Sequence, residues 1–503
     1  MEVVVAVVVT VVVAGIWWRR RGRDEPPSPA GGLPVIGHLH LLRPPVHRRL
    51  QELSSRVGVG GAPLMHLRLG STPCVVASTA EAASELIRGH EASISERPVT
   101  AVARQFAYGS SGFAFAPYDA HWRFMKRLCM SELLGPRTVE QLRPVRRAGT
   151  VELICHLLAS ASSREVVDLT RHLIRLSNTS IIRMVASTVP GAVTDEAQDL
   201  VKEVAELVGA FNAADYIAAC RGWDVQGLQR RAADVHRRFD ALLEDIIAHK
   251  EDARRDKKQH KDLLDILLDK AEDEAAEVKL TRDNIKAFII DVVTAGSDTS
   301  AAMVEWMLVE LLNHPDALRK VQQEMDAAVG GDRIVSEAEL PRLPYLMAAY
   351  KETLRLHPAA PIAHRQSSER MLLLRARGGG FTVPPQAAVF INVWAIGRDP
   401  AFWEDPEAFR PERFMPGGAA EALEPRGQHF HFMPFGSGRR GCPGMGLALQ
   451  SVPAVLAALV QCFHWNKLDD IIDMEESDGL VCARKNPLLL RPVARLNPFP
   501  AVV

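Results

Sequence analysis

The sequence lacks the features that mark several common protein classes. Its 503 residues include only seven cysteines, scattered between positions 74 and 482 without a C-x-x-C pair. This distribution argues against a disulfide scaffold or a zinc site and favours reduced thiols. The formal net charge is −1, so no basic surface is indicated that would bind nucleic acid. Internal repeats are absent, and so is a nicotinamide- or flavin-binding motif in a strand–helix context.

The composition is ordinary for a globular protein with a large core, since 47% of the residues are apolar and 24% are charged. The apolar pattern between residues 81 and about 348 is mostly helical, although the charged stretch 249–261 should be a solvated loop or helix end. Short strands are expected at 65–69 and 74–77, and again beyond residue 381, where proline and glycine are frequent. A last helix should run from just after Pro443 to about Phe463. We therefore expect one mainly helical domain with minor sheets.

The N-terminal segment has the pattern of a membrane anchor. Residues 3–18 are apolar or small, and arginines follow at positions 19, 20, 21 and 23. As a helix this run spans about 24 Å, slightly less than the ~30 Å of a bilayer core. Its charge follows the apolar run, whereas a cleaved signal peptide carries its charge before it. We predict a signal anchor with a basic flank over residues 1–24; a peripheral or buried hydrophobic segment is the alternative. A proline-rich hinge (25–37) would then lead into the globular domain (38–503).

One predicted helix stands out by its length and by the residues at its centre. No proline interrupts residues 281–313, and His314-Pro315 ends the pattern. Such a helix is ~50 Å long, and its many apolar residues predict burial. Its middle holds Ala295-Gly296-Ser297-Asp298-Thr299, of which the last four are poor helix formers. A local conflict of this kind often marks a functional site; a notch that packs small residues is the alternative.

A glycine-rich turn surrounds Cys442, in the segment from Phe435 to Gly444. Glycine lets the backbone approach a flat ligand closely, and proline at 443 favours the first turn of a helix. A cysteine near a helix N-terminus, beside Arg439 and Arg440, should have a lowered thiol pKa. A lone thiolate with two arginines suits one axial ligand of a haem. The alternative is a glycine turn with a buried structural cysteine.

These residues resemble a signature of the cytochrome P450 family. Phe435, Gly438, Arg440, Cys442 and Gly444 match its haem-binding pattern F-x-x-G-x-R-x-C-x-G. Four further segments are similar to motifs of the family and follow in its order: Trp122 and Lys126 (W-x-x-x-R/K), Ala295 to Thr299 (A/G-G-x-D/E-T), Glu352 and Arg355 (E-x-x-R), and residues 409–414 (the P-E-R-F segment). With the hinge and the anchor, the resemblance covers the whole chain.

The resemblance implies a mainly α fold with small β-sheets, in which a long central helix lies over haem b and Cys442 binds the iron. It implies a monooxygenase that uses dioxygen and electrons from NADPH through NADPH–cytochrome P450 reductase. The anchor would cross the endoplasmic reticulum membrane once, with the catalytic domain in the cytosol. Asp298 and Thr299 would act with Cys442 as catalytic residues. The residues implied to hold the haem are Trp122, Lys126, Arg365, Phe435, Arg440, Cys442 and Gly444.

Two roles implied by the resemblance have a physical basis in the residue spacing. Glu352 and Arg355 are three apart and can pair on one helix face; with Arg413 they would form a structural triad behind the thiolate. Lys126 would bind a haem propionate, because cationic side chains suit carboxylates. Arg127 is an adjacent competitor for that role.

The substrate is indicated only by resemblance and by a few expected pocket residues. Residues 33–42, 392–400 and 495–500 resemble a plant group that contains flavone synthase II, flavanone 2-hydroxylase and isoflavonoid synthases. This implies oxidation of a flavanone at C2, the 2-hydroxyflavanone being released or dehydrated to a flavone. Isoflavonoid-forming relatives tend to carry lysine before the position of Arg365, where this chain has His364, which argues against aryl migration. The expected pocket residues are Phe113, Phe115, Ala295, Ala360, His364 and Val481.

The sequence alone leaves other functions open besides flavanone oxidation. Aromatic side chains can stack on a planar phenolic substrate, but any one of them could simply pack the core. A triterpenoid hydroxylase of the same broad group is a second candidate. A haem protein or isomerase that does not activate oxygen is a third, and the Asp298–Thr299 pair favours a monooxygenase over it.

Overall fold

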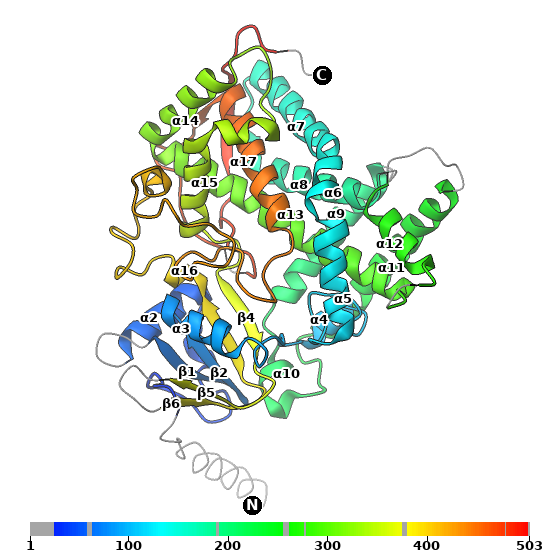
Figure 1. Cartoon of the computed structure of the whole chain (residues 1–503), viewed down its shortest axis with the longest axis vertical. Coiled ribbons are helices and arrows are strands. Elements are labelled where there is room, and N and C mark those ends of the chain that lie inside the picture. Colours follow the sequence, from blue (N-terminus) through cyan, green and yellow to red (C-terminus); the bar gives the residue numbers. More distant parts are fainter. Residues whose placement is uncertain are drawn as a thin grey trace, which may run out of the picture.

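The structure, a computed structural model, describes residues 25–57, 63–187, 191–254, 261–275, 278–374, 380–477 and 479–500. The predicted membrane anchor, residues 1–24, lies outside the described residues. The described chain is mainly helical with three small sheets, as the sequence predicts (Figure 1).

The helices range from single turns to 32 residues. The α-helices are α2 (Val46–Arg56), α3 (Ala80–Ser84), α4 (Ala101–Phe106), α5 (Ala120–Leu128), α6 (Pro136–Gln141), α7 (Arg143–Ser163), α8 (Leu169–Val185), α9 (Gly191–Gly209), α10 (Ala213–Tyr216), α11 (Leu228–Ala253), α12 (Leu263–Glu272), α13 (Arg282–Asn313), α14 (Pro315–Ala328), α15 (Pro344–Leu356), α16 (Val393–Ile396) and α17 (Met445–Cys462). Short 3₁₀ or π segments are η1 (Leu39–Leu41), η2 (Glu85–Gly89), η3 (Cys129–Leu133), η4 (Ala218–Cys220), η5 (Glu337–Arg342) and η6 (Pro411–Phe414).

The largest sheet has the strand order β1–β2–β7–β4, in which β2 and β7 run parallel and the other pairs antiparallel. With α2 and α3 it occupies one end of the molecule, at the bottom of Figure 1. Two smaller sheets have the orders β3–β9–β8 and β5–β6. The strands are β1 (Leu64–Leu69), β2 (Thr72–Ala77), β3 (Val167–Asp168), β4 (Ile362–Gln366), β5 (Met371–Leu374), β6 (Gly380–Val383), β7 (Ala388–Asn392), β8 (Phe463–Lys467) and β9 (Leu489–Ala494).

Helix α13 is the long helix predicted from the sequence. It begins in a capping box, in which the side chains of Thr281 and Asn284 each accept the backbone N–H of the other. The helix packs against α8, α15 and α17. At Gly296 a Cβ would lie 3.1 Å from Ile181 of α8, so the small residues in the middle of α13 also serve packing. Among the described helices, α13 and α17 are long and apolar enough to cross a membrane, but both are largely buried inside the domain.

The proline-rich segment 25–37 and the charged stretch 249–261 both contact the rest of the domain. Residues 25–37 are non-helical apart from turns, but the segment packs on the domain, where His66 N–H donates to Pro27 O (2.9 Å) and Gly37 pairs with Leu69. In the stretch 249–261, helix α11 continues to Ala253, and residues 255–260 lie outside the described residues. Lys250 is only 3% exposed and forms ion pairs with two buried aspartates, Asp262 and Asp265. The stretch begins with a helix end, which is one of the two predicted forms, but Lys250 itself is not solvated.

The three residues of the expected triad come together in the interior. Arg355 donates from Nε and Nη2 to the two carboxylate oxygens of Glu352, each at 2.7 Å. Arg413, on η6, donates from Nε to Glu352 Oε1 at 3.2 Å. The cluster thereby ties α15 to the segment around η6. The remaining donors of Arg355 reach the backbone carbonyls of Gly397, Pro406 and Ala408.

Replacing Glu352 with alanine should destabilise the protein severely. The change leaves two arginines without their carboxylate in an interior where the Arg355 side chain is 0% exposed, and breaking a buried pair costs about 3–5 kcal/mol. We expect a fall of several degrees in Tm by circular dichroism and a lower soluble yield. Arg319→Ala, which removes an exposed pair with Asp316, should change Tm little. Similar Tm values for the two variants would contradict the role of the triad.

Candidate active site

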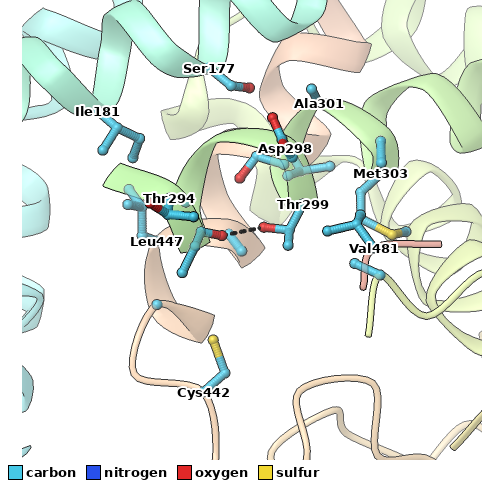
Figure 2. Close-up of a pocket in the computed structure, with 18 of the residues that line it drawn as sticks. Ser177, Ile181, Thr294, Asp298, Thr299, Ala301, Met303, Cys442, Leu447 and Val481 are labelled. Atoms are coloured by element: carbon cyan, nitrogen blue, oxygen red, sulfur yellow. Dashed lines mark hydrogen bonds between the residues drawn. The ribbon is translucent and has the colours of Figure 1, made fainter. Parts of the chain in front are cut away.

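The glycine-rich turn around Cys442 leads into α17 and faces a large internal cavity. Gly436 and Gly438 adopt φ values of +69° and +68°, which residues other than glycine rarely allow. Two backbone hydrogen bonds close the turn, from Cys442 N to Phe435 O (2.9 Å) and from Gly441 N to Gly438 O (3.0 Å). The cavity has a volume of about 1310 Å³ and separates the turn from α13 (Figure 2). The predicted turn and the helix that follows it are confirmed.

The thiol pKa of Cys442 differs from the prediction. Burial raises it, and this effect outweighs the backbone amides of Gly444 and Met445 and the cations Lys126 and Arg97, which all lower it. The prediction of a lowered pKa was wrong because it considered the helix start and the neighbouring charges but not desolvation by the walls of the cavity, towards which the Cys442 side chain is exposed. A bound metal cation would reverse the balance, since it stabilises the thiolate directly.

Four cationic side chains from different parts of the chain converge beside the turn. They are Arg97 from the loop before α4, Lys126 from α5, Arg365 from β4 and Arg440 from the turn itself. Burial lowers the pKa of all four, to about 9 for Arg365 and about 10 for Arg440. Within the described ranges, none of them forms an ion pair with a carboxylate, and Arg97 Nε has no hydrogen-bond partner. Buried charge without compensation is costly, so this cluster fits a ligand with several negative charges.

Helix α5 presents one of its two adjacent cations to the cavity. Lys126 points inward, and its Nζ donates to a backbone carbonyl of the turn at 2.7 Å, whereas Arg127 is exposed. Trp122 is buried, and its Nε1 donates to Phe113 O at 3.0 Å. The guanidinium of Arg440 lies 4.5 Å from the centre of the Trp122 ring. Trp122 thus supports a cation of the cluster, while its own N–H is used within the protein.

Arg97 and Asp291 belong to the site although no motif marks them. Asp291 lies on α13 about two turns before Asp298 and accepts the backbone N–H groups of Phe113 (2.8 Å) and Ala114 (3.0 Å). It therefore fixes the loop between α4 and α5 against α13. Burial raises the pKa of Asp291 to about 6. An acidic residue within an apolar helix was the available signal for Asp291, whereas nothing in the sequence distinguishes Arg97.

The Asp298–Thr299 pair faces the cavity from α13. Thr299 donates its hydroxyl hydrogen to Ala295 O (2.7 Å), which leaves its oxygen able to accept. Figure 2 shows Cys442 on the opposite side of the cavity, with its sulfur directed towards α13. Burial raises the pKa of Asp298, and Lys202 on α9 opposes this rise. A carboxyl with a raised pKa is better suited to give and take a proton.

The six residues expected to contact a substrate all line this cavity. The Phe113 ring also packs against Phe288 of α13, with centroids 5.6 Å apart, so it serves the core and the cavity together. Burial, with Arg97 and Arg365 nearby, lowers the pKa of His364 to about 4. Its imidazole is therefore neutral at physiological pH and gives the cavity wall a polar group without a charge. The six residues are Phe113, Phe115, Ala295, Ala360, His364 and Val481.

The C-terminal loop that carries Val481 is held from outside the cavity by Glu476. The Glu476 carboxylate forms hydrogen bonds with His47 Nε2 (2.8 Å) and Arg48 Nε (2.5 Å), both on α2. Trp394 on α16 donates from Nε1 to its other oxygen at 3.1 Å. The first α-helix of the described chain, α2, and the C-terminal wall of the cavity are thereby connected.

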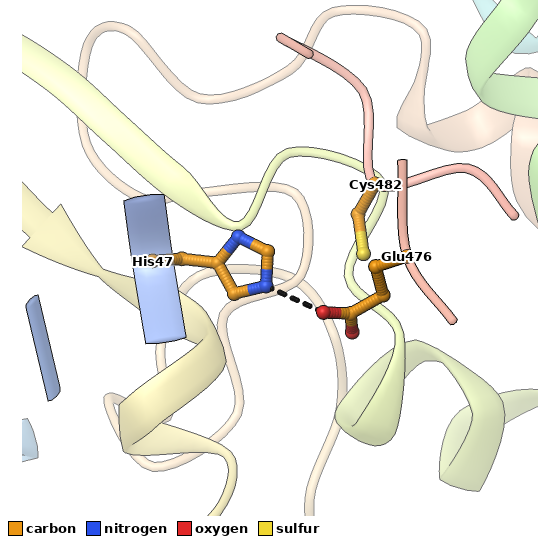
Figure 3. Close-up of side chains that lie close together, drawn as sticks. All are labelled: His47, Glu476 and Cys482. Carbon is orange, nitrogen blue, oxygen red and sulfur yellow. Dashed lines mark hydrogen bonds and ion pairs between the residues drawn. The ribbon is translucent and has the colours of Figure 1, made fainter. Parts of the chain in front are cut away.

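The same cluster contains three groups of the kind that bind metal ions. Figure 3 shows His47, Glu476 and Cys482 together, and their possible ligand atoms lie within 4.8 Å of one another. The carboxylate charge is already balanced by Arg48, however, and the backbone of Cys482 is fixed by Trp306, whose Nε1 donates to Cys482 O at 2.7 Å. The cluster therefore serves as an anchor for the loop.

Comparison with known proteins agrees with this geometry. Residues 26–491 match the family described as cytochrome P450. The chain belongs to the cytochrome P450 family. It is 74% identical to cytochrome P450 93G1 of Oryza sativa subsp. japonica over 484 residues, covering 95% of this chain and 92% of that protein. It is 47% identical to 3,9-dihydroxypterocarpan 6A-monooxygenase of Glycine max, covering 95% of this chain and 94% of that protein.

More distant relatives of this P450 have diverse names. It is 38% identical to beta-amyrin 24-hydroxylase of Glycine max (95% of this chain, 94% of that protein) and 37% identical to 2-hydroxyisoflavanone synthase of Glycyrrhiza uralensis (94% and 92%). A solved zebrafish cytochrome P450 with progesterone shares the fold, with a TM-score of 0.75 at 24% identity over 90% of this chain and 100% of that one. The family, fold, monooxygenase class and haem-thiolate cofactor inferred from the sequence are confirmed. P450 enzymes generally take electrons from a redox partner and act on small molecules.

The residues present fit a haem. Phe435 and Gly444 line the cavity beside Cys442, and a Cβ at Gly444 would lie 3.8 Å from the sulfur. The four converging cations would meet the two propionates of a haem, which supply the missing negative charge. The cavity also exceeds the ~300–1,000 Å³ of an ordinary ligand pocket, which leaves space for a substrate beside the haem.

Cys442→Ser should abolish the spectral signature of a thiolate-bound iron. The haem-loaded P450, reduced and exposed to carbon monoxide, should show a Soret band shifted far to the red, because the thiolate pushes electron density onto the iron. Cys155→Ser, which removes an exposed thiol on α7, should leave that band unchanged. A red-shifted band that survives in Cys442→Ser would mean that another group binds the iron.

Arg97→Ala should weaken haem binding although no motif includes Arg97. The change removes one of the four cations that would face the propionates, so the variant should show a lower haem-to-protein absorbance ratio. It should also transfer haem several-fold faster to an apomyoglobin acceptor. Arg127→Ala, which removes the outward-facing cation of α5, is the matched control and should behave like the parent protein. Equal transfer rates for the two variants would exclude Arg97 from the haem site.

Proposed function

We propose that this P450 oxidises a flavanone at C2. One oxygen atom of O2 enters the C2–H bond and the other leaves as water, so that flavanone, O2, NADPH and H⁺ give 2-hydroxyflavanone, H2O and NADP⁺. The 2-hydroxyflavanone is then released, or it loses water across C2 and C3 to give the flavone.

The observation that carries this proposal is the composition of the cavity wall next to Cys442 and α13. Phe113 and Phe115 offer flat apolar surfaces for aromatic rings, and Ala295 and Ala360 leave room above the haem. His364 adds one neutral imidazole, which can exchange a hydrogen bond with a carbonyl or phenol oxygen without placing a charge beside it. An apolar wall with one uncharged polar group suits a flavanone.

The relatives support the flavonoid class over the alternatives. Identity is higher to 3,9-dihydroxypterocarpan 6A-monooxygenase (47%) than to beta-amyrin 24-hydroxylase (38%), although 2-hydroxyisoflavanone synthase is no more similar (37%) than the latter. A relative named 2-hydroxyisoflavanone synthase shows that a 2-hydroxylated product occurs within this group. We therefore favour a flavanone over a triterpenoid substrate.

Within this reaction we assign roles to three residues of the chain. Cys442 would bind the haem iron through its thiolate, and the hydroxyl oxygen of Thr299 would accept a hydrogen bond on the α13 side of the cavity. Asp298 moves protons from the α9 side of α13, where Lys202 lies, into the cavity. When bound, the haem supplies the activation of dioxygen and the insertion of one oxygen atom into a C–H bond.

We further propose NADPH–cytochrome P450 reductase as the electron donor and the endoplasmic reticulum membrane as the location. The sequence has no nicotinamide- or flavin-binding motif in a strand–helix context, so electrons must come from another protein. The apolar run at residues 3–18 with arginines behind it supports a single-pass anchor and a cytosolic catalytic domain.

A microsomal assay under ¹⁸O2 tests the proposed reaction. Full-length P450 with a reductase, NADPH and a flavanone should form 2-hydroxyflavanone with one ¹⁸O atom at C2, or the flavone that its dehydration yields. Omitting NADPH and using Cys442→Ser are the controls, and neither should give product. Turnover of beta-amyrin without any turnover of flavanones would show that the substrate is a triterpenoid.

A further inference from the structure

Glu91 contacts the turn before Cys442 from a distant part of the sequence. It follows η2 and lies 348 positions before Arg439, whose backbone N–H donates to Glu91 Oε1 at 2.5 Å. The described lining of the cavity does not include Glu91. The carboxylate therefore reaches the turn from outside the haem site.

The backbone of the turn is shaped to let this carboxylate approach. Gly438 has φ +68°, and a Cβ at this position would overlap Glu91 Oε1. Two features therefore disfavour any residue other than glycine at position 438: the positive φ angle of the backbone and the nearby Glu91 carboxylate. The glycine that the haem-binding pattern requires is also the residue against which Glu91 lies.

Besides the backbone hydrogen bonds that close the turn and the bond from Ser437 Oγ to Gly427 O, the turn is held by two members of the cation cluster. Lys126 Nζ donates to Gly441 O (2.7 Å), and Arg440 Nε donates to Ser95 O (2.7 Å). Both cations also face the position of the haem propionates, which would compete for their donors. The bond from Arg439 N–H to Glu91 has no such competitor, since it lies outside the cavity and joins a carboxylate to the main chain.

We propose that Glu91 is a positioning residue for the axial ligand. By holding the main chain at Arg439, it limits the movement of the turn that would carry the Cys442 sulfur away from the iron. Loss of this contact makes exchange of the thiolate for a neutral or non-sulfur ligand faster, while the rest of the fold is retained.

A simpler explanation is that Glu91 only forms a surface ion pair. Arg439 Nε lies 3.4 Å from Glu91 Oε2, and the side chains of Arg439 and Glu91 are 38% and 32% exposed. Pairs of this kind contribute little. The two explanations separate experimentally, because Arg439→Ala removes the ion pair and keeps the backbone N–H that Glu91 accepts.

The experiment compares Glu91→Ala, Glu91→Gln and Arg439→Ala in the haem-loaded, full-length P450. Each protein is reduced under carbon monoxide, and the loss of the red-shifted Soret band is followed at urea concentrations that leave the far-UV circular dichroism unchanged. Glu91→Ala should lose the band several-fold faster than the parent. Glu91→Gln, whose amide oxygen can still accept the N–H, should restore most of the difference, and Arg439→Ala should stay within about twofold of the parent.

Three outcomes would overturn the proposal. The first is an unchanged rate in Glu91→Ala, and the second is an equal acceleration in Arg439→Ala, which would leave only the ion pair. The third is that, in Glu91→Ala, no urea concentration removes the band without also lowering the helical signal, which would mean general destabilisation. If Glu91→Ala does not yield haem protein, Glu91→Asp takes its place in the experiment. Because the aspartate side chain is shorter and reaches the Arg439 N–H less well, this variant should lose the band faster than Glu91→Gln does.

Discussion

Positive charge gathered beside the cavity, without an ion pair to any carboxylate of the described residues, is the constraint on which this site depends. Arg97, Lys126, Arg365 and Arg440 crowd one side of the cavity, and the pKa of Arg365 is lowered by its own neighbours Arg97 and Arg440 as well as by burial. An anionic haem removes this repulsion, so its binding must stabilise the folded chain by mass action. Because the four cations come from two loops, a helix and a strand, the haem also joins those parts into one unit.

Much of the fold could be predicted because its signals are local. Helix α13 has a capping residue at its start, no proline in its length and a proline just beyond its end. The turn at Cys442 needs glycine where φ is positive, and that need is visible as a pattern of letters. Glu352 and Arg355 are three positions apart, which suffices to predict that they pair on one helix face. In each case the residues that determine the structure are neighbours in sequence.

The parts that could not be predicted depend on contacts across the chain. Arg97 and Glu91 act from irregular segments, so neither periodicity nor spacing reveals them, whereas Asp291 shows in the sequence only as an acidic residue within an apolar helix. The thiol pKa of Cys442 was predicted in the wrong direction because the degree of enclosure of a sulfur is a property of the folded state. The same reason explains Lys250, whose charged sequence context suggested water but whose partners are two buried aspartates.

The loop residue Phe113 connects two parts of the enzyme that are usually described separately. Its N–H binds Asp291, its carbonyl accepts from Trp122 and Arg440, and its ring lines the cavity. A molecule that displaced this ring would also shift the carbonyl to which Trp122 and Arg440, two residues expected to hold the haem, donate. If such a molecule changes the affinity of the protein for haem by some factor, thermodynamic reciprocity requires that haem changes the affinity for the molecule by the same factor. Binding of a molecule in the substrate space and retention of the haem would therefore depend on each other, and a measurement of either one would report on both.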